Sequence, residues 1–460
     1  MRCVIKEAKG TFPHPISHIT HPKMLNPLCW LVAALIFTAF AVNPGKAWAL
    51  FGDTESAFGF DGRFSTLPAL QDNYDFDPFF GDDDTDLFWQ TLLRLIAAGR
   101  PSEQISYDVQ AVQSFDYSSA GVESESPIFR SGSAETRYRA MDANWDWHEG
   151  DKTSATLWLD RANAKLALAK ADITIGRQAI TFGKAYFWNP LDVFLAFDPR
   201  QFDRDYKAGV DAIRADVSWS PFSGVNLVAV AGRQLDGSGE FVDDGSFVNA
   251  SWYGSALMAH AFTTYEGWDF ALQTGKIYGG YQLGGGLVGE IGPVETRVEA
   301  AYFWAQDDSE PLPDPQQGDL VEDNFTAVVG LGHRFDNTLT LQFEYFYNGA
   351  GDPDDLNGSF FRFASGNILQ MSRNLTGFLV SYEFQPILIG QVIWLHSWDD
   401  ASNNIQPILT WSATDNMDLL VGANLNFGER PEGTSVLDFQ IESEYGTFPN
   451  LYFMQFKWYF

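Results

Sequence analysis

Residues 338–347 read TLTLQFEYFY, a stretch in which apolar and polar side chains take turns. Phe343 and Tyr345 fall on one side of the alternation, whereas Gln342 and Glu344 fall on the other. Successive side chains of a β-strand point to opposite faces, so this period of two predicts a strand with one apolar and one polar face. A tilted strand of about ten such residues is long enough to cross a lipid bilayer.

The same alternation recurs along the chain and predicts an all-β protein of about 18 antiparallel strands, within a range of roughly 16 to 20. The predicted strands are 56–66, 86–98, 103–117, 153–169, 171–183, 206–219, 223–233, 254–265, 268–278, 281–291, 294–305, 323–334, 337–348, 374–384, 387–398, 404–413, 415–427 and 450–460. The connection after every second strand is short, whereas most intervening connections are long, with shorter ones after the ninth and fifteenth strands. Short periplasmic turns and long outer loops are typical of a transmembrane up-and-down β-barrel. A soluble β-sheet protein is the alternative, but it has no physical reason to sort its loops by length.

The N-terminus has the composition of a signal peptide. A basic stretch precedes the uncharged segment 29–42, which has 14 residues and is shorter than the roughly 20 residues of a membrane-spanning helix. Ala47 and Ala49 supply the small residues that a signal peptidase requires. We therefore expect residues 1–49 to be removed after Ala49, and residues 50–460 to form one barrel domain in the outer membrane of a Gram-negative bacterium. A retained N-terminal anchor is the alternative.

The C-terminal stretch LYFMQFKWYF, residues 451–460, also alternates and ends in phenylalanine. It resembles the terminal signal by which outer-membrane barrels are recognised by the barrel-assembly machinery. We expect Trp458 and Phe460 to be the central residues of this assembly signal. The alternative is an edge strand of a soluble sheet, where such an apolar row would promote aggregation.

Residues 171–216 carry a narrower resemblance. They read ADITIGRQAITFGKAYFWNPLDVFLAFDPRQFDRDYKAGVDAIRAD. The Gly-Arg-Gln strand, the aromatic loop after it and the returning Asp-Tyr-Lys-x-Gly-Val-Asp resemble the alginate-export type of porin-like outer-membrane barrel. The resemblance covers about a tenth of the chain. It implies a barrel of 18 strands that passes anionic polysaccharide or small solutes passively.

Charged residues on the predicted strands are candidates for the lining of the lumen. The basic candidates, on the fourth to sixth strands, are Arg161, Lys165, Arg177, Lys207 and Arg214. The acidic candidates, on the eleventh and thirteenth strands, are Glu295, Glu299 and Glu344. Opposed basic and acidic arcs would create a field across the pore that selects among charged solutes. The alternative is that these residues are solvated or paired across strands. The alternation leaves open whether Arg161, next to Asp160, and Arg177, next to Gln178, point inward, and a β-bulge could resolve either case.

The predicted loop 184–205 is unusually aromatic for a connection exposed to water. We expect it to fold into the barrel as a constriction or plug, whose candidate residues are Phe187, Trp188, Asp192, Phe197 and Arg204. The alternative is that the loop packs on its neighbours at the outer rim.

Composition excludes several classes of protein. The 460 residues include 29 Lys+Arg and 60 Asp+Glu, a net charge of −31, so the chain lacks the basic surface of a nucleic-acid-binding protein. A mean hydropathy of −0.16 excludes a helical membrane bundle. We expect no enzymatic activity, since the four histidines beyond residue 49 are widely separated and no Gly-x-Ser-x-Gly or phosphate-binding loop is present.

We expect no cofactor and no catalytic metal. The acidic run that includes Asp82, Asp83 and Asp84 could hold Ca²⁺ or Mg²⁺ near lipopolysaccharide, although a solvated run of charges is the simpler interpretation. The expected partners are outer-membrane lipid, lipopolysaccharide, the assembly machinery and small or anionic solutes. The sequence thus predicts a porin-like passive channel. Two alternatives remain open: a barrel that sheathes a partner such as a multihaem cytochrome, and a hydrolase with its site in the lumen.

Overall fold

In the computed structural model, the described residues are 56–75, 85–120, 136–234, 248–306, 319–433 and 439–460. Their strands are β1 (Gly59–Asp72), β2 (Thr85–Ser102), β3 (Ile105–Ser118), β4 (Asn144–Glu149), β5 (Thr153–Ala167), β6 (Ala171–Gln178), β7 (Val210–Ser220), β8 (Ser223–Val230), β9 (Ala256–Tyr265), β10 (Trp268–Ile277), β11 (Gly280–Ile291), β12 (Val294–Ala305), β13 (Asn324–Arg334), β14 (Thr340–Asn348), β15 (Asn374–Gln385), β16 (Leu388–Ser397), β17 (Asn403–Thr414), β18 (Met417–Phe427) and β19 (Asn450–Tyr459). The helix α3 (Leu356–Ala364) lies between β14 and β15. Within the described ranges, no helix is both long enough and apolar enough to cross a membrane.

The strands close into a single antiparallel barrel. Each strand pairs with the next along the chain, except that β3 pairs with β5 and the last strand, β19, pairs with β1. The strand β4 lies outside this circuit and pairs with the outer half of β5. The circuit therefore contains 18 strands, which confirms the predicted all-β barrel and its strand number.

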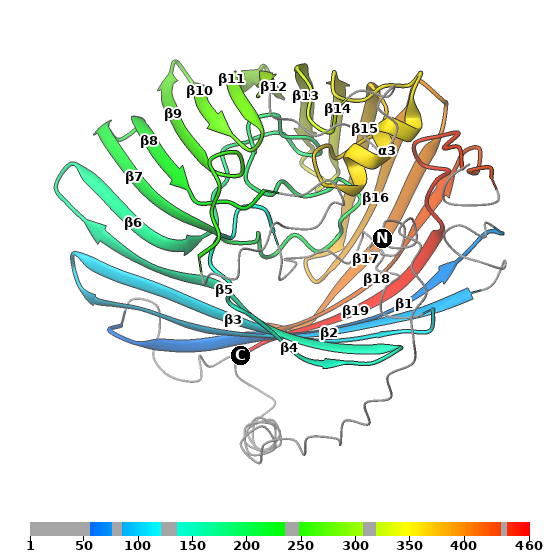
Figure 1. The fold of residues 1–460 in the computed structure, drawn as a ribbon, viewed down its shortest axis with the longest axis horizontal. Coiled ribbons are helices and arrows are strands. Elements are labelled where there is room, and N and C mark those ends of the chain that lie inside the picture. Colours follow the sequence, from blue (N-terminus) through cyan, green and yellow to red (C-terminus); the bar gives the residue numbers. More distant parts are fainter. Residues whose placement is uncertain (1–55, 76–84, 121–135, 235–247, 307–318, 434–438) are drawn as a thin grey trace, which may run out of the picture.

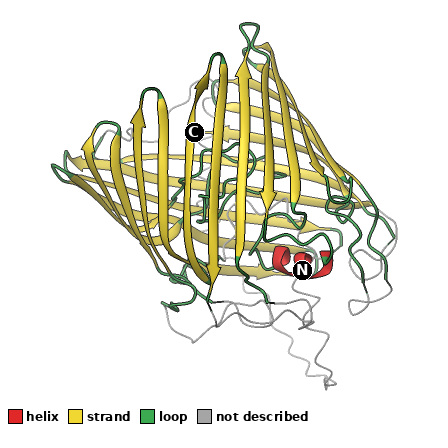
Figure 2. Ribbon diagram, turned by 90° about the horizontal axis from the view of Figure 1, so that it is seen from above, coloured by secondary structure: helices red, strands yellow, loops and turns green. Residues whose placement is uncertain are grey.

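The two ends of the barrel differ in the length of their connections. Figure 2 shows hairpin turns at one end of the yellow strands, and longer loops with α3 at the other, which we call the outer end. The turns include residues 221–222 and 386–387, while the loops include 349–373. The two shorter loops expected at the outer end are 278–279 and 398–402.

Alternation along the strands sorts side chains between the outside and the inside. On β14, Phe343 and Tyr345 are 39% and 37% exposed, whereas Glu344 between them is completely buried. On β19, Tyr452 and Met454 are exposed on the outside. The apolar row therefore coats the barrel and the polar row points inward, as the period of two predicted.

The largest departure from the predicted strands occurs at the outer end of β6. The predicted strand 171–183 ends instead at Gln178, and β7 begins only at Val210. Between these residues the chain leaves the wall and runs through the interior of the barrel (Figure 1). The outer half of β5 would then lack a partner on this side, and β4 takes that place by pairing with Ser154–Trp158. The alternation did not predict β4, because its pairing partner depends on where β6 stops.

Two smaller elements also differ from the prediction. The first strand was expected to end at 66, but Pro68, which lacks the N–H that a strand interior uses, does not interrupt it. Instead, β1 continues to Asp72, with Pro68 opposite Trp89 on β2. The helix α3 lies within a predicted loop and begins after Asp355, whose carboxylate accepts a hydrogen bond from the Gly358 N–H at 3.0 Å. The predicted cleavage site after Ala49 lies outside the described residues.

Candidate functional site

The connection between β6 and β7, residues 179–209, is the candidate functional element, and we call it the inner loop. In Figure 1 it runs inside the ring of strands rather than over the outer rim. Its side chains include Trp188 and Phe194, which are 1% and 0% exposed. Large aromatic side chains gain roughly 1.5–3 kcal/mol each from full burial, so they favour a loop that is packed against the wall over one that hangs in water.

The inner loop is held on the β12–β14 side of the barrel by two glutamates. Glu344 on β14 accepts hydrogen bonds from the backbone N–H groups of Tyr186 and Phe187 at 2.5 and 2.8 Å. Glu299 on β12 accepts one from the Lys184 N–H and a longer one, of 3.4 Å, from Leu191. A buried carboxylate is stable only where hydrogen bonds replace its water, and here backbone N–H groups of the loop supply them.

Aromatic contacts attach the inner loop to the same wall and to the last strand, β19. Trp188 stacks on Phe346 of β14, with ring centroids 5.4 Å apart and an interplanar angle of 10°. Phe202 stacks on Phe453 of β19, at 3.9 Å and 11°. The loop therefore spans the lumen, from β14 to the seam where the last strand meets the first.

At this seam the inner loop presents two carboxylates to a group of donors. The side chain of Asp203 pairs with Arg63 of β1, with Gln455 at 2.8 Å and with Lys457 at 3.1 Å. Asp205 pairs with Lys457 and accepts from the Tyr459 hydroxyl, in both cases at 2.8 Å. Burial opposes the ionisation of Asp203, but the adjacent Arg63 and Lys457 outweigh it and hold its pKa well below the ordinary value.

The residues that carry the family resemblance build the two ends of the inner loop. Gly176 has a φ of +113° and, like Gly209, faces a backbone carbonyl of β5 so closely that a Cβ would collide with it. Between them, Arg177 pairs with Asp211 at 2.7 Å. Lys207 pairs with Asp192 inside the loop. These residues thus fix the points at which the chain leaves and rejoins the wall.

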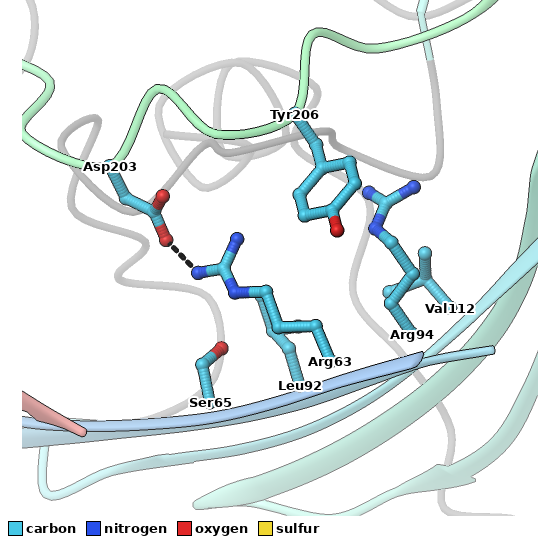
Figure 3. Close-up of a pocket in the computed structure, with 7 residues that line it drawn as sticks. All are labelled: Arg63, Ser65, Leu92, Arg94, Val112, Asp203 and Tyr206. Atoms are coloured by element: carbon cyan, nitrogen blue, oxygen red, sulfur yellow. Dashed lines mark hydrogen bonds and ion pairs between the residues drawn. The ribbon is translucent and has the colours of Figure 1, made fainter. Parts of the chain in front are cut away.

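A cavity lies between the inner loop and the wall near β1, β2 and β3. Figure 3 shows Arg63 and Arg94 rising from the strands toward Tyr206, which descends from the loop. The Arg94 guanidinium lies 4.1 Å from the centre of the Tyr206 ring, within the range of a cation–π interaction. The residues that line the cavity are Arg63, Ser65, Leu92, Arg94, Val112, Asp203 and Tyr206.

The direction of Arg161 is set by a β-bulge. The register between β3 and β5 shifts here, so that Arg161 is opposite Gln110 while Leu159 is opposite Ala111, with Asp160 between them unmatched. As a result, both neighbours reach inward: Arg161 donates to the Lys207 carbonyl at 3.1 Å, and Asp160 is fully buried. A β-bulge of this kind resolves the ambiguity in the sequence, in which Asp160 and Arg161 could not both point inward under strict alternation.

Four residues of the predicted charged arcs, Arg177, Lys207, Glu299 and Glu344, are buried and do not face open water, and this part of the prediction is wrong. Arg177 has a completely buried side chain and donates to the carbonyls of Leu159 and Met141 as well as to Asp211. Glu299 and Glu344 are 1% and 0% exposed, because the inner loop covers them. Sequence alternation indicated the inward direction of Glu299 and Glu344 and left that of Arg177 open, but it could not show that another segment would occupy the space.

Lys207 and the other arc residues are each matched with an opposite charge, apart from Arg161, whose nearest carboxylate is 3.9 Å away on Asp108. The pairs within 3 Å are Lys165 with Asp172, Lys207 with Asp192, Arg214 with Asp216, and Glu295 with Arg297. Lys207 lies in the inner loop rather than on a strand. Partly exposed side chains remain on Arg161, Lys165, Arg214 and Glu295, so the effect of these residues on passing ions stays a prediction.

The candidate constriction residues all lie in the inner loop. Phe187, Trp188 and Asp192 are buried, and Phe197 is half-buried. Arg204 donates hydrogen bonds to several carbonyls of the loop itself, including that of Tyr186 at 3.1 Å. It therefore stiffens the loop from within. The sequence missed the seam donors, of which only the inward position of Lys457 in the alternating C-terminal strand was a usable signal.

The acidic run considered for Ca²⁺ or Mg²⁺ is largely untested by the structure, since Asp82, Asp83 and Asp84 lie outside the described residues. Among the residues that are described, no three His, Cys, Asp or Glu side chains are grouped so as to hold a metal ion. Asp86, at the end of the run, accepts hydrogen bonds from Asn73 and Ser119, each at 2.7 Å.

The buried interactions of Arg177 predict that this residue stabilises the folded barrel. Arg177→Ala should destabilise the barrel by about 3–5 kcal/mol, because it leaves the Asp211 carboxylate and two backbone carbonyls without their buried partner. The matched control is Arg214→Ala, whose partly exposed pair with Asp216 should cost only about 0–1 kcal/mol. The measurement is the temperature at which the folded band disappears in a heat-modifiability gel. Equal shifts for the two variants would show that the Arg177 network is not a structural anchor.

Comparison with solved structures gives the same barrel. The chain is similar to OccAB1 of Acinetobacter baumannii, with 7% identity, a TM-score of 0.54, and coverage of 90% of this chain and 98% of that one. It is similar to OccAB2 of the same organism, with 10% identity, a TM-score of 0.52, and coverage of 89% and 99%. It is also similar to Pseudomonas aeruginosa OpdK with vanillate, with 12% identity, a TM-score of 0.50, and coverage of 89% and 100%. At such low identity the likeness concerns the fold.

No protein-family model matches the sequence, and no curated protein matches it.

Proposed function

We propose that this protein is a porin-like channel of the Gram-negative outer membrane, through which small solutes, and small anions above all, pass passively. The observation that carries the proposal is the inner loop, which spans the lumen of a barrel of 18 strands. An unfilled barrel of this size leaves a wide aqueous path. A loop tied to the wall at several points converts such a path into a narrow one.

The choice of small anions rests on the cavity beside the inner loop. Two guanidinium groups, on Arg63 and Arg94, line one small space together with the Ser65 hydroxyl, and the chain's own carboxylates, on Asp203 and Asp160, already pair with them as a solute carboxylate would. Arginine groups bind carboxylates well, because their donors match the two oxygens. The resemblance to alginate-export barrels and the structure of OpdK with vanillate, a carboxylate, support the same class of solute.

The two other functions have less support. A barrel that sheathes a cytochrome needs an empty lumen, whereas here Trp188 and Phe194 are buried inside it. A hydrolase needs a nucleophile beside a histidine and an orienting carboxylate. The described histidines instead have as hydrogen-bond partners Thr153, Gln273, the Pro293 carbonyl and Asn403.

The proposal also covers the export of the chain and its assembly in the outer membrane. Export would end with cleavage after Ala49, and assembly would depend on Trp458 and Phe460. Outer-membrane lipid and lipopolysaccharide would then cover the outside, where exposed aromatic residues such as Trp398 and Phe427 lie.

Osmotic swelling of proteoliposomes tests the proposed function. Liposomes that contain the purified protein should swell in isosmotic succinate or glycine, while empty liposomes should not. Swelling should be slow in a trisaccharide, because the inner loop narrows the path. Equal rates for protein-containing and empty liposomes in every solute would overturn the proposal.

A further inference from the structure

Four donors converge on one point of the wall, at the seam between β19 and β1. They are Arg63, Gln455, Lys457 and Tyr459, and in the register of this seam Arg63 lies opposite Tyr459. Arg63 and Lys457 are 6% and 5% exposed. Two cations so deeply buried are costly unless anions neutralise them. The wall therefore carries a site for negative charge that must always be filled.

The inner loop fills this site with two carboxylates. Asp203 is bound by Arg63, Gln455 and Lys457, and Asp205 contacts Arg63 at 3.2 Å as well as Lys457 and Tyr459. Both carboxylates thus share the same two cations. Their donor set is the one that a small dicarboxylate would need in order to bind here.

The two loop carboxylates differ in their exposure to solvent, and this difference permits their exchange for a solute carboxylate. The Asp203 side chain is 9% exposed, whereas that of Asp205 is 34% exposed. Beside them lies the cavity with Ser65 and Tyr206, and within the described ranges the buried Nε of Arg63 has no hydrogen-bond partner. An incoming carboxylate can therefore reach the donors at Asp205 before Asp203 is released.

We propose that the seam site of Arg63, Gln455, Lys457 and Tyr459 binds small dicarboxylate solutes, and that Asp203 and Asp205 act as an internal competitor for it. The loop carboxylates hold the loop against the wall in the absence of solute, and a dicarboxylate displaces them. This inference rests on the proposed function and names the solute class for which the channel is selective.

The direct test is binding of succinate to the detergent-solubilised protein, measured by isothermal titration calorimetry, with succinamide as the uncharged control. In Asp203→Asn/Asp205→Asn the competitor is removed, so succinate should bind at least about tenfold more tightly than to the wild type, because the competent state is no longer a minor one. Adding Lys457→Gln to this variant should abolish the gain. Unchanged succinate affinity in the double variant would overturn the inference.

A matched variant separates competition from loosening of the loop. Phe202→Ala removes the stack on Phe453 but keeps both carboxylates. If the carboxylates compete as proposed, its succinate affinity should rise much less than that of the double variant. An equal rise in both variants would mean that loop attachment in general, and not charge competition, limits access, which contradicts the inference.

The double variant leaves two buried cations uncompensated, and its folding is therefore a second readout. If the inference is right, succinate should raise its unfolding temperature strongly and succinamide should not, since a ligand that binds only the folded state stabilises it. A double variant that neither succinate nor succinamide stabilises would overturn the inference. These measurements need no membrane, so absent binding with intact liposome swelling refutes the dicarboxylate site alone, whereas absent swelling refutes the proposed function.

Discussion

Replacing residues 181–207 with a short glycine–serine link is expected to open the barrel to solutes that the wild type excludes. Gln178 and Val210 are opposite each other in the β6–β7 register, so a short link can join these strands without moving the wall. The replacement removes Trp188, Phe194 and the rest of the material that spans the lumen. A barrel of 18 strands then retains a wide aqueous channel.

The measurement is the rate of proteoliposome swelling in a series of neutral sugars of increasing size. We expect the replaced protein to admit sugars that produce almost no swelling with the wild type, a change of several-fold or more for the largest. A heat-modifiability gel serves as the control that the barrel has still formed. If a folded, loop-replaced protein keeps the size limit of the wild type, the inner loop is not the constriction.

Deleting Asn450–Phe460 should abolish assembly altogether. Those residues form β19, which pairs with both β18 and β1, so their loss leaves two open strand edges where a closed barrel has none. The backbone N–H and C=O groups of a lipid-exposed edge cannot be satisfied, which is why a partly closed barrel is not stable in a bilayer.

A smaller deletion should impair assembly less severely. Removing Phe460 alone takes away its two backbone hydrogen bonds with Gly62, at 2.8 and 3.0 Å, together with the terminal aromatic residue. We expect the full deletion to remain in the periplasm and the single deletion to assemble at a reduced level, as judged by membrane fractionation and heat modifiability. Normal outer-membrane assembly of the full deletion would contradict the closed-barrel account.

Most of the wall could be predicted from the sequence, because strand direction and facing follow from a period of two. Phe343 and Glu344 illustrate this, since the alternation alone predicted that they face opposite sides of the wall. The exceptions to this rule have specific causes. The bulge at Asp160 adds a residue that alternation cannot count, and the place of β4 depends on where the distant β6 stops.

The interior was harder to predict, because its contacts join residues far apart in the chain. The aromatic content of the inner loop pointed inward, but nothing local showed that Glu344 would bind its backbone or that Asp203 would meet Lys457. The assumption that inward charges face water failed for Arg177 for the same reason. An inward direction is a property of one strand, whereas solvent access depends on every segment that enters the lumen.

The central claim is that an otherwise wide barrel is narrowed by a loop anchored inside it, and single-channel recording in planar bilayers tests it most directly. The wild type should give discrete current steps, and the protein with 181–207 replaced should give steps several times larger under the same salt and voltage. Absence of current from both proteins, or steps of equal size from both, would contradict the account.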